Sequence, residues 1–353
     1  MGFNNNQQAL LELVRAGLWE RDVELRKYGA TDYSQILQLA MEQSVVGLVA
    51  AGLERVKDMK VPQEWALQFI GQTLQIEQRN KAMNAFIAEL GEKMRKADIC
   101  ALLVKGQGVA QCYERPLWRP SGDVDFLLSE EDYEKAVSFF KTLYDNNKNG
   151  GGYSKEYAFY TDQWMIELHG SLRTGLSSRI DKMVDAVQKS VFYGGNVRSW
   201  DNGGVQVFLP EPTEDVFLVF THFIKHFYKE GMSLRQVCDW CRLLYTYRDS
   251  LNYGLLEKWI RKAELMGEWR AFASLAVDFL GMPEEAMPLF NLNDNLNHNK
   301  KAEKLTEFIL GGYSGKVKDT WRMGKIFPWH TFKFLPSIFL NVNGLKIKER
   351  IFS

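Results

Sequence analysis

The chain has 353 residues, which is enough for about two or three domains with buried cores. Its 46% hydrophobic and 25% charged residues are ordinary for a globular protein, and a net charge of zero does not indicate a nucleic-acid-binding protein. Four scattered cysteines are too few for a disulfide scaffold and predict reduced thiols. No apolar run approaches the roughly 20 residues of a membrane-spanning helix, and the first residues lack a signal-peptide pattern. We therefore expect a cytoplasmic protein without a transmembrane segment.

The first part of the chain, residues 1–97, is helical in pattern. From residue 8 onward, apolar side chains recur at three- and four-residue spacing, which predicts amphipathic helices. Gly29 interrupts the pattern, and Pro62 is suited to the start of a new helix. No catalytic motif stands out here. We expect a helical region that serves packing.

The pattern changes at residue 99, where short apolar segments predict buried strands. Residues 99–104 (ICALLV) form one continuous apolar run, and residues 122–129 (GDVDFLLS) form a second. Between them, residues 105–108 (KGQG) predict a turn into a short helix that ends at Pro116. The region from about residue 98 to 209 is therefore expected to combine strands with helices.

A hairpin is predicted further along the same region. Residues 155–161 (KEYAFYT) and 164–172 (WMIELHGSL) alternate in polarity and are separated by two residues. Because alternate residues of a strand point to the same face, Glu167 shares its face with His169. A carboxylate and an imidazole are thus expected to project together from this strand.

Two aspartates lie close together at the start of the strand in residues 122–129. Asp123 and Asp125 are two residues apart and point to one face, whereas Val124 and Phe126 point to the other, into a core. Like charges held so close repel, and a divalent metal ion is the usual compensation. With Glu167 on a neighbouring strand, the pattern predicts a metal-binding carboxylate cluster. The alternative is a turn with solvated acids.

Helices are predicted again over residues 210–290. One helix begins near Thr213 and ends at Gly231, a second begins with Ser233 and Gln236 in capping-box spacing, and a further helical stretch runs to Gly281. Polar side chains form a stripe on each of the first two helices: His222, Lys225, His226 and Lys229, then Arg235, Asp239 and Arg242. This stripe predicts either a wall that faces a ligand or a solvated surface with an Arg235–Asp239 ion pair.

Four of these helical residues also suggest an alternative. His222 and His226 lie one helical turn apart, and Cys238 and Cys241 follow on the next helix, so the four are candidate zinc ligands. The cysteines, however, lie in an apolar pattern, where cysteine is usually a small buried hydrophobic residue. We favour the apolar interpretation.

The last part, residues 291–353, is a basic and aromatic extension. From Lys300 onward it has eleven Lys or Arg against four Asp or Glu, a difference of about +7. Its Phe and Trp residues are expected to pack on the helices, and contact with an anionic acceptor or a membrane surface is the alternative.

Three segments together carry a resemblance to a known family. They are residues 104–128 (VKGQGVAQCYERPLWRPSGDVDFLL), 166–172 (IELHGSL) and 222–244 (HFIKHFYKEGMSLRQVCDWCRLL). The combination resembles an uncharacterised bacterial nucleotidyltransferase family of the DNA polymerase β-like superfamily, over about residues 99–244. The resemblance implies an α+β fold. Its small mixed-sheet core at 98–209 would be flanked by the helical region 1–97 and by a helical domain, 210–290, that faces the cleft.

The resemblance also implies an activity and roles for the acidic residues. The activity is transfer of a nucleoside monophosphate from a nucleoside triphosphate to an acceptor, with release of pyrophosphate. The acceptor is a small molecule, a sugar, a protein or RNA. Asp123, Asp125 and Glu167 would be catalytic and would bind Mg²⁺ or Mn²⁺, and Glu167 would help to deprotonate the acceptor hydroxyl.

The remaining site residues follow from the same resemblance. Lys105, Gly106, Gln107, Gly108 and Arg119 would bind the nucleotide, although Gly106-Gln107 replaces the glycine-serine pair of the wider superfamily. Arg119 is alternatively a structural ion-pair partner. The residues expected to position a substrate are His169, His226, Arg235 and Asp239.

Two other functions fit the same sequence. A nucleotide-binding regulator would keep the fold without turnover, and a helical protein-interaction module would carry the acidic strand without using it. The oligomeric state is not predicted.

Overall fold

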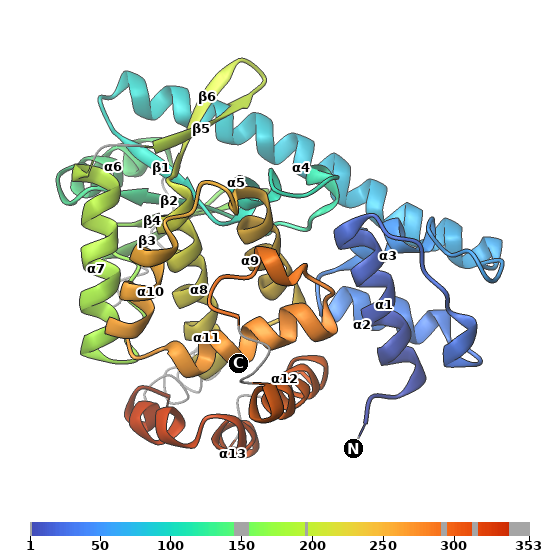
Figure 1. Cartoon of the computed structure of the whole chain (residues 1–353). Helices are drawn as coiled ribbons and strands as arrows, with labels where there is room; N and C mark the ends of the chain where they lie inside the picture. The colour runs from blue at the N-terminus through green and yellow to red at the C-terminus, as the bar shows by residue number, and fades with distance from the viewer. Residues whose placement is uncertain (1, 145–154, 195–196, 291–294, 313–316, 339–353) are drawn as a thin grey trace.

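The computed structural model describes residues 2–144, 155–194, 197–290, 295–312 and 317–338 (Figure 1). The predicted helical N-terminal region is confirmed. Its helices are α1 (Asn5–Trp19), α2 (Tyr33–Glu42), α3 (Val46–Leu53) and α4 (Gln63–Lys96), with a short 3₁₀ turn, η1 (Arg26–Tyr28). Helix α4 begins directly after Pro62, as expected. Its 34 residues run along one edge of the molecule, from the N-terminal helices to the sheet.

Helices α1 and α3 approach each other closely through two glycines. A Cβ at Gly17 would lie 2.1 Å from the Leu48 carbonyl oxygen, and a Cβ at Gly52 would lie 2.2 Å from that of Leu13. No other residue fits this contact without moving a helix, so the N-terminal region is packed backbone against backbone.

The core contains a four-stranded mixed sheet, as predicted. In spatial order the strands are β1 (Ala101–Val104), β2 (Asp123–Leu128), β4 (Met165–His169) and β3 (Glu156–Tyr160). Strands β2 and β4 are parallel neighbours, whereas β1–β2 and β3–β4 are antiparallel pairs. The parallel register sets Asp125 opposite Glu167. Two carboxylates that are 42 positions apart in the chain are thereby placed on one face.

The two faces of the sheet differ completely. Val124, Phe126, Ile166 and Leu168 point to one side, where they form a core with α4 and α6 (Glu130–Leu143). The opposite face carries Asp123, Asp125, Glu167 and His169, and it is turned toward α8 (Pro212–Lys229) and α9 (Leu234–Tyr247) (Figure 1). The expected separation of apolar and acidic faces is confirmed.

Two elements between residues 173 and 210 were not predicted. One is α7 (Ser178–Tyr193), and the other is the hairpin of β5 (Val197–Asn202) and β6 (Val205–Pro210), which turns at two glycines with positive φ. The hairpin is fixed to the helices because Arg198 forms a buried ion pair with Asp215. Strand β6 also packs beside β1 and so extends the core.

The helical region after residue 210 agrees with the prediction in outline but not at every boundary. Helix α8 begins at Pro212, and Thr213 instead accepts a hydrogen bond from the Asn252 backbone (3.0 Å). The predicted capping box of α9 is present. The stretch expected to run to Gly281 is divided, because Glu264 adopts a positive φ of 60°. It consists of α10 (Tyr253–Lys262), α11 (Met266–Ser274) and a π-helical turn, η3 (Leu275–Phe279).

The C-terminal part packs on these helices only in part. It contains α12 (Asn295–Leu310), α13 (Val317–Ile326) and a helical segment at 328–338. Phe308, Phe327 and Phe334 are buried against α8, as predicted. Three other aromatic side chains remain largely exposed: Trp321 at 63%, Trp329 at 72% and Phe332 at 71%. Within the described ranges, no helix is both long and apolar enough to cross a bilayer.

Candidate active site

A cavity of about 420 Å³ lies between the acidic face of the sheet and helices α8 and α9. Most of the residues that the sequence singled out line it: Lys105, Gly106, Arg119, Asp123, Asp125, Glu167, His169, His226, Arg235 and Asp239. Gln107 and Gly108 are not among its lining residues. The fold thus brings ten of the twelve predicted site residues to one cavity.

The carboxylates on β2 lie in different environments. Asp125 is buried, whereas Asp123 lies nearer the solvent and is half-buried. The negative charge of Asp125, with help from burial, raises the pKa of Asp123 above its ordinary value. Burial would also raise the pKa of Asp125, but Lys105 and His169 outweigh it and hold that pKa well below the ordinary value. The two aspartates therefore repel each other, as the sequence predicted. Asp125, and not Asp123, is the carboxylate that contacts Lys105 and His169.

Lys105 and His169 are the partners of Asp125. The Lys105 ammonium lies 3.0 Å from Asp125 Oδ1, and His169 Nε2 lies 2.7 Å from the same oxygen and 3.4 Å from Glu167 Oε2. Burial opposes the charge on Lys105, yet Asp125 and Glu167 raise its pKa above the ordinary value. The pKa of His169 is also raised, because its hydrogen bonds to both carboxylates outweigh its burial. The Lys105 ammonium and the His169 ring thus lie against the acidic cluster.

The tightest set of possible metal ligands differs in one member from the predicted set. Ligand atoms of Asp125, Glu167 and His169 all lie within 4.8 Å of one another. His169 enters this group because it lies two residues beyond Glu167 on the same face of β4. Asp123 lies at the edge of the group on β2. The carboxylate oxygens of this set suit Mg²⁺ or Mn²⁺, whereas an imidazole nitrogen is more typical of softer transition-metal ions.

Arg119 is engaged in a buried ion pair rather than free to bind a ligand. Its guanidinium donates two hydrogen bonds to Asp239, of 2.9 and 2.6 Å, and both side chains are buried. The Tyr113 hydroxyl donates to the same carboxylate (2.7 Å). Asp239 therefore pairs with Arg119, and the Arg235–Asp239 ion pair that the helix spacing suggested is not formed. The correct partner is 120 positions away and could not be found from helical periodicity.

Arg235 has the opposite character. It donates to the Pro120 carbonyl oxygen (2.9 Å), and its Nε is buried without a hydrogen-bond partner. Among the described residues no carboxylate lies within ion-pair distance of it. Burial, followed by repulsion from Arg119, lowers its pKa below the ordinary value. Arg235 is thus a cation on the cavity wall whose Nε–H can still donate a hydrogen bond.

Gln107 and Gly108 are turned away from the cavity, contrary to the prediction. The Gln107 side chain is buried and donates to Asn80 Oδ1 of α4 (2.7 Å). A Cβ at Gly108 would lie 2.8 Å from a methyl group of Leu209 on β6. Because successive residues of a helix point about 100° apart, these two cannot share the cavity face of Gly106 in the short helix α5 (Gly106–Ala110). They support the turn and do not line the site.

Asn80 is a residue that sequence reasoning missed. It is buried, and its amide donates to the carbonyl oxygens of Leu117 and Arg119 (both 2.8 Å), so it holds the loop that leads into β2. Asn80 is one of two asparagines on the long helix α4, and the sequence around it gives no signal of this role.

His222 was predicted as part of the polar stripe but not among the residues expected to position a substrate. It lines the cavity one turn before His226, and the two Nε2 atoms are 2.9 Å apart. Burial holds the pKa of His222 well below the ordinary value and lowers that of His226 to about 4. Zinc binding with Cys238 and Cys241 is not supported, because both cysteines are buried in the apolar core, where burial raises the pKa of each thiol.

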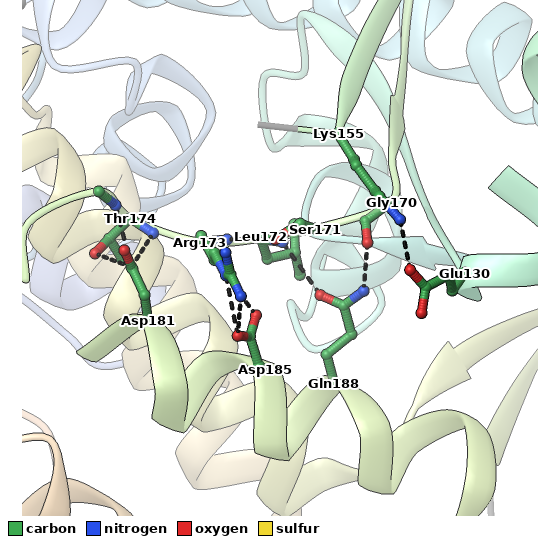
Figure 2. A network of polar contacts seen from close by, with 11 residues as sticks. Glu130, Lys155, Gly170, Ser171, Leu172, Arg173, Thr174, Asp181, Asp185 and Gln188 are labelled. Atoms are coloured by element: carbon green, nitrogen blue, oxygen red, sulfur yellow. Dashed lines mark hydrogen bonds and ion pairs between the residues drawn. The ribbon is translucent and has the colours of Figure 1, made fainter. Parts of the chain in front are cut away.

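The segment of residues 170–176 follows β4 and lines one side of the cavity with Ser171, Leu172 and Arg173. Three side chains of the unpredicted helix α7 hold this segment (Figure 2). Gln188 donates to Gly170, Asp185 accepts three hydrogen bonds from Arg173, and Asp181 accepts from Thr174 and Gly175. Beside it, Lys155 pairs with Glu130 (2.8 Å). The wall beside β4 is therefore held by polar contacts on both ends.

The fold and the cavity define a class of protein. A small mixed sheet with paired aspartates on one strand, a glutamate on the parallel neighbour and a helical wall opposite is the arrangement of a nucleotidyltransferase core. A family model described as "Uncharacterised nucleotidyltransferase" matches residues 29–281, which is more than half of the chain. The chain belongs to this family, and the resemblance seen in its sequence is confirmed.

Other comparisons add less. A solved structure, that of an antigenic nucleotidyltransferase-like protein from Paracoccidioides brasiliensis, is similar to 60% of this chain over 95% of its own length. Its sequence identity is 10% and the TM-score is 0.37, so no argument rests on it. No curated protein matches the chain.

Proposed function

We propose that the protein transfers a nucleoside monophosphate from a nucleoside triphosphate to an acceptor hydroxyl or phosphate group, with release of pyrophosphate and in dependence on Mg²⁺ or Mn²⁺. The observation that carries the proposal is the register of β2 and β4, which sets Asp125 opposite Glu167 in a cavity that also holds cationic side chains. Family membership supports the reaction class. The acceptor is not assigned.

The metal ions would be held by Asp123, Asp125 and Glu167, with His169 as an additional ligand. The carboxylate oxygens fit, since oxygen ligands are those that Mg²⁺ and Mn²⁺ prefer. His169 would bind a metal ion only as the neutral imidazole. When bound, such ions stabilise negative charge on the attacking and leaving oxygens of a phosphoryl group. The closeness of Lys105 to Asp125 supports the same interpretation, because this ammonium lies where positive charge is required.

Lys105 would then contact the nucleotide. With its carboxylate partners bound to metal, the ammonium is released from Asp125 and can bind a phosphate group at the mouth of the β1–α5 turn. Gly106 lines the cavity and gives the triphosphate close access to the backbone there. Arg235, which has an unpaired Nε, is the second phosphate-binding group that we assign. Arg119 and Asp239 position the loop before β2 rather than touching the nucleotide.

The test is calorimetric titration of ATP, GTP, CTP and UTP into the protein, with and without Mg²⁺ or Mn²⁺, and with the Asp123→Asn/Asp125→Asn variant alongside. We expect binding of at least one triphosphate that requires metal and is lost in the variant. Transfer of label from the α-³²P form of that triphosphate to material in a dialysed cell extract would then establish turnover. Binding without any transfer would favour the non-catalytic regulator, and no binding would favour the interaction module.

The state of the cysteines bears on the compartment in which the protein works. All four cysteines are free thiols, three of them buried, which suits a reducing compartment. A cytoplasmic location therefore stays a prediction.

The division of the chain into four regions, with boundaries at residues 97, 209 and 290, also stays a prediction.

A further inference from the structure

Three side chains at the end of α8 form a continuous chain of hydrogen bonds that reaches the cavity. Glu230 Oε2 lies 3.1 Å from His226 Nδ1, and His226 Nε2 lies 2.9 Å from His222 Nε2. All three residues line the cavity, and Lys225 Nζ lies 3.4 Å from Glu230 Oε1. The function proposed above uses none of these contacts.

The positions of the protons in this chain follow from chemistry. A carboxylate only accepts hydrogen bonds, so the hydrogen between Glu230 and His226 belongs to Nδ1 of His226. A neutral His226 then has a bare Nε2, which must accept from Nε2–H of His222. A neutral His222 in turn has a bare Nδ1. Among the described residues this atom has no hydrogen-bond partner, so the chain ends in a free proton acceptor.

The surroundings keep both rings neutral. Burial is the largest cause of the lowered pKa of each histidine. The charged groups that act on them come from every wall: the cations Lys105, Lys225 and Arg235 disfavour protonation, while Asp125 and Glu230 favour it. At neutral pH the terminal nitrogen therefore keeps its lone pair.

We propose that Glu230, His226 and His222 form a proton relay, in which His222 Nδ1 accepts the proton of the acceptor hydroxyl during nucleotidyl transfer. This inference rests on the proposed function and adds the group that takes the proton. His222 is the catalytic residue of the relay because it touches the acceptor. His226 and Glu230 are positioning residues that fix its tautomer.

The step balances as follows. The acceptor oxygen forms a bond to the α-phosphorus while the bond from that phosphorus to the pyrophosphate oxygen breaks, and pyrophosphate leaves with the electron pair. The hydroxyl proton moves to Nδ1 of His222, and the Nε2 proton of His222 moves to Nε2 of His226. The resulting imidazolium of His226 lies against the Glu230 carboxylate. It then returns its Nε2 proton to Nε2 of His222, and His222 releases its Nδ1 proton to water, which restores the starting tautomers.

The relay leaves the carboxylates free for metal binding. Glu167 is within hydrogen-bonding range of His169 and shares its ligand group, so a second role as base would compete with coordination. His222 lies on the opposite wall, on α8, and reaches the same cavity, where its ring is hydrogen-bonded to His226 rather than to that group. The acceptor is thus expected to enter between the two walls.

The first test reads the proton positions directly and needs no substrate. Long-range ¹H–¹⁵N correlation spectra of the ¹⁵N-histidine-labelled full chain at pH 7 should show His226 as the Nδ1–H tautomer and His222 as the Nε2–H tautomer. Spectra of His222→Gln and His226→Gln variants assign the signals. The opposite tautomer for either ring, or an imidazolium, would overturn the relay.

The second test uses the label-transfer assay described above. His222→Gln should lower the transfer rate about 100-fold, the lower range for loss of a general base, while the dissociation constant of the triphosphate changes less than about threefold. Imidazole in solution should partly restore a His222→Ala variant. Glu230→Gln, which keeps an acceptor for Nδ1–H but loses the charge, should lower the rate about tenfold. The matched control is Glu257→Gln on α10, whose partner Arg261 is far from the cavity.

The outcomes separate the two proposals. Transfer by the wild type together with a His222→Gln rate within about threefold of it would overturn the relay alone. Absence of transfer with every triphosphate and metal would overturn the proposed function, and the relay with it. Thermal unfolding of each variant shows whether a lost rate reflects lost folding.

Discussion

The two walls of the cavity differ in how their charges are compensated. On the sheet wall, Asp125 is held between Lys105 and His169 at 3.0 and 2.7 Å. On the helical wall, Arg235 has no carboxylate partner among the described residues, and burial lowers the pKa of His222 and of His226. The sheet wall thus carries carboxylates that are compensated by neighbouring cations. The helical wall carries a cation, Arg235, that has no carboxylate partner among the described residues.

The difference shows which wall would bind which part of a substrate complex. A buried carboxylate cluster is stable only with positive charge beside it, and Lys105 supplies that charge at Asp125. A buried guanidinium with an unused donor is stable only marginally and gains most from an anion. Under the proposed function, metal at the sheet and phosphate or acceptor at the helices would satisfy both walls at once. The substitutions below act on the sheet wall, on the loop between the walls, on the helical wall and on the contacts that support the loop.

The largest effect is expected for Asp125→Asn on the sheet wall. Nucleotidyl transfer should fall by about 10³-fold, in the upper range for removal of one electrostatic stabiliser of a transition state. Because Lys105 and His169 would lose their partner, the free energy of unfolding should also fall by about 3–5 kcal/mol. Label transfer and urea unfolding measure the two effects.

Asp123→Asn is the matched control for that stability effect. Repulsion from Asp125 raises the pKa of Asp123, so removing its charge relieves strain rather than creating it. We expect lost transfer with unchanged or slightly higher stability. Equal destabilisation by the two variants would contradict the assignment of Asp125 as the charge-compensated member.

The second effect concerns the ion pair that holds the loop between the walls. Asp239→Asn leaves the buried Arg119 without its partner and should lower stability by about 3–5 kcal/mol at pH 7. Combining it with Arg119→Met should recover most of the loss. Arg119 outweighs the burial of Asp239 and holds its pKa below the ordinary value, so the stabilisation exists above about pH 4 and is lost as the pH falls through the folded-state pKa. Urea unfolding at pH 7 and pH 3 should therefore show the variant closest to wild type at the lower pH.

The third effect isolates the helical wall. Arg235→Gln removes a charge that has no ionic partner, so stability should change by less than about 1 kcal/mol. The affinity for the triphosphate with metal should fall about tenfold or more, as expected for a charge-assisted hydrogen bond to phosphate. Calorimetry compares it with Arg261→Gln on the surface of α10. Unchanged affinity would indicate that Arg235 does not bind the phosphate and would leave Lys105 as the phosphate-binding residue.

How much the sequence predicted also differs between the two walls. On the sheet wall, alternation alone separated Asp123 and Asp125 from Val124 and Phe126, and it placed His169 with Glu167. That the two strands are adjacent came from family resemblance, and the register of β2 and β4 agrees with it. A strand pattern with a period of two thus determined the face that carries the acids.

The helical wall was less predictable because its contacts are long-range. Helical spacing suggested Arg235 as the partner of Asp239, but the actual partner, Arg119, comes from the loop before β2. The orientation of Gln107 depends on Asn80, which is on a helix 27 positions earlier. Local periodicity specifies which side of an element faces inward, but not which residue of a distant element it meets there.

The smallest effect on triphosphate affinity is expected for a substitution that removes this long-range support. Asn80→Ala would remove the donor to the Leu117 and Arg119 carbonyl oxygens and leave the Gln107 amide with only the Met83 sulfur as acceptor, which should lower stability by about 1–3 kcal/mol. Because these groups fix the loop before β2 and the turn at Lys105, affinity for the triphosphate should fall a few fold even though Asn80 does not line the cavity. Gln78→Ala, on the exposed side of α4, is the control for helix propensity. A change in stability with unchanged affinity would show that the sheet wall keeps its geometry through the carboxylates and their cations alone.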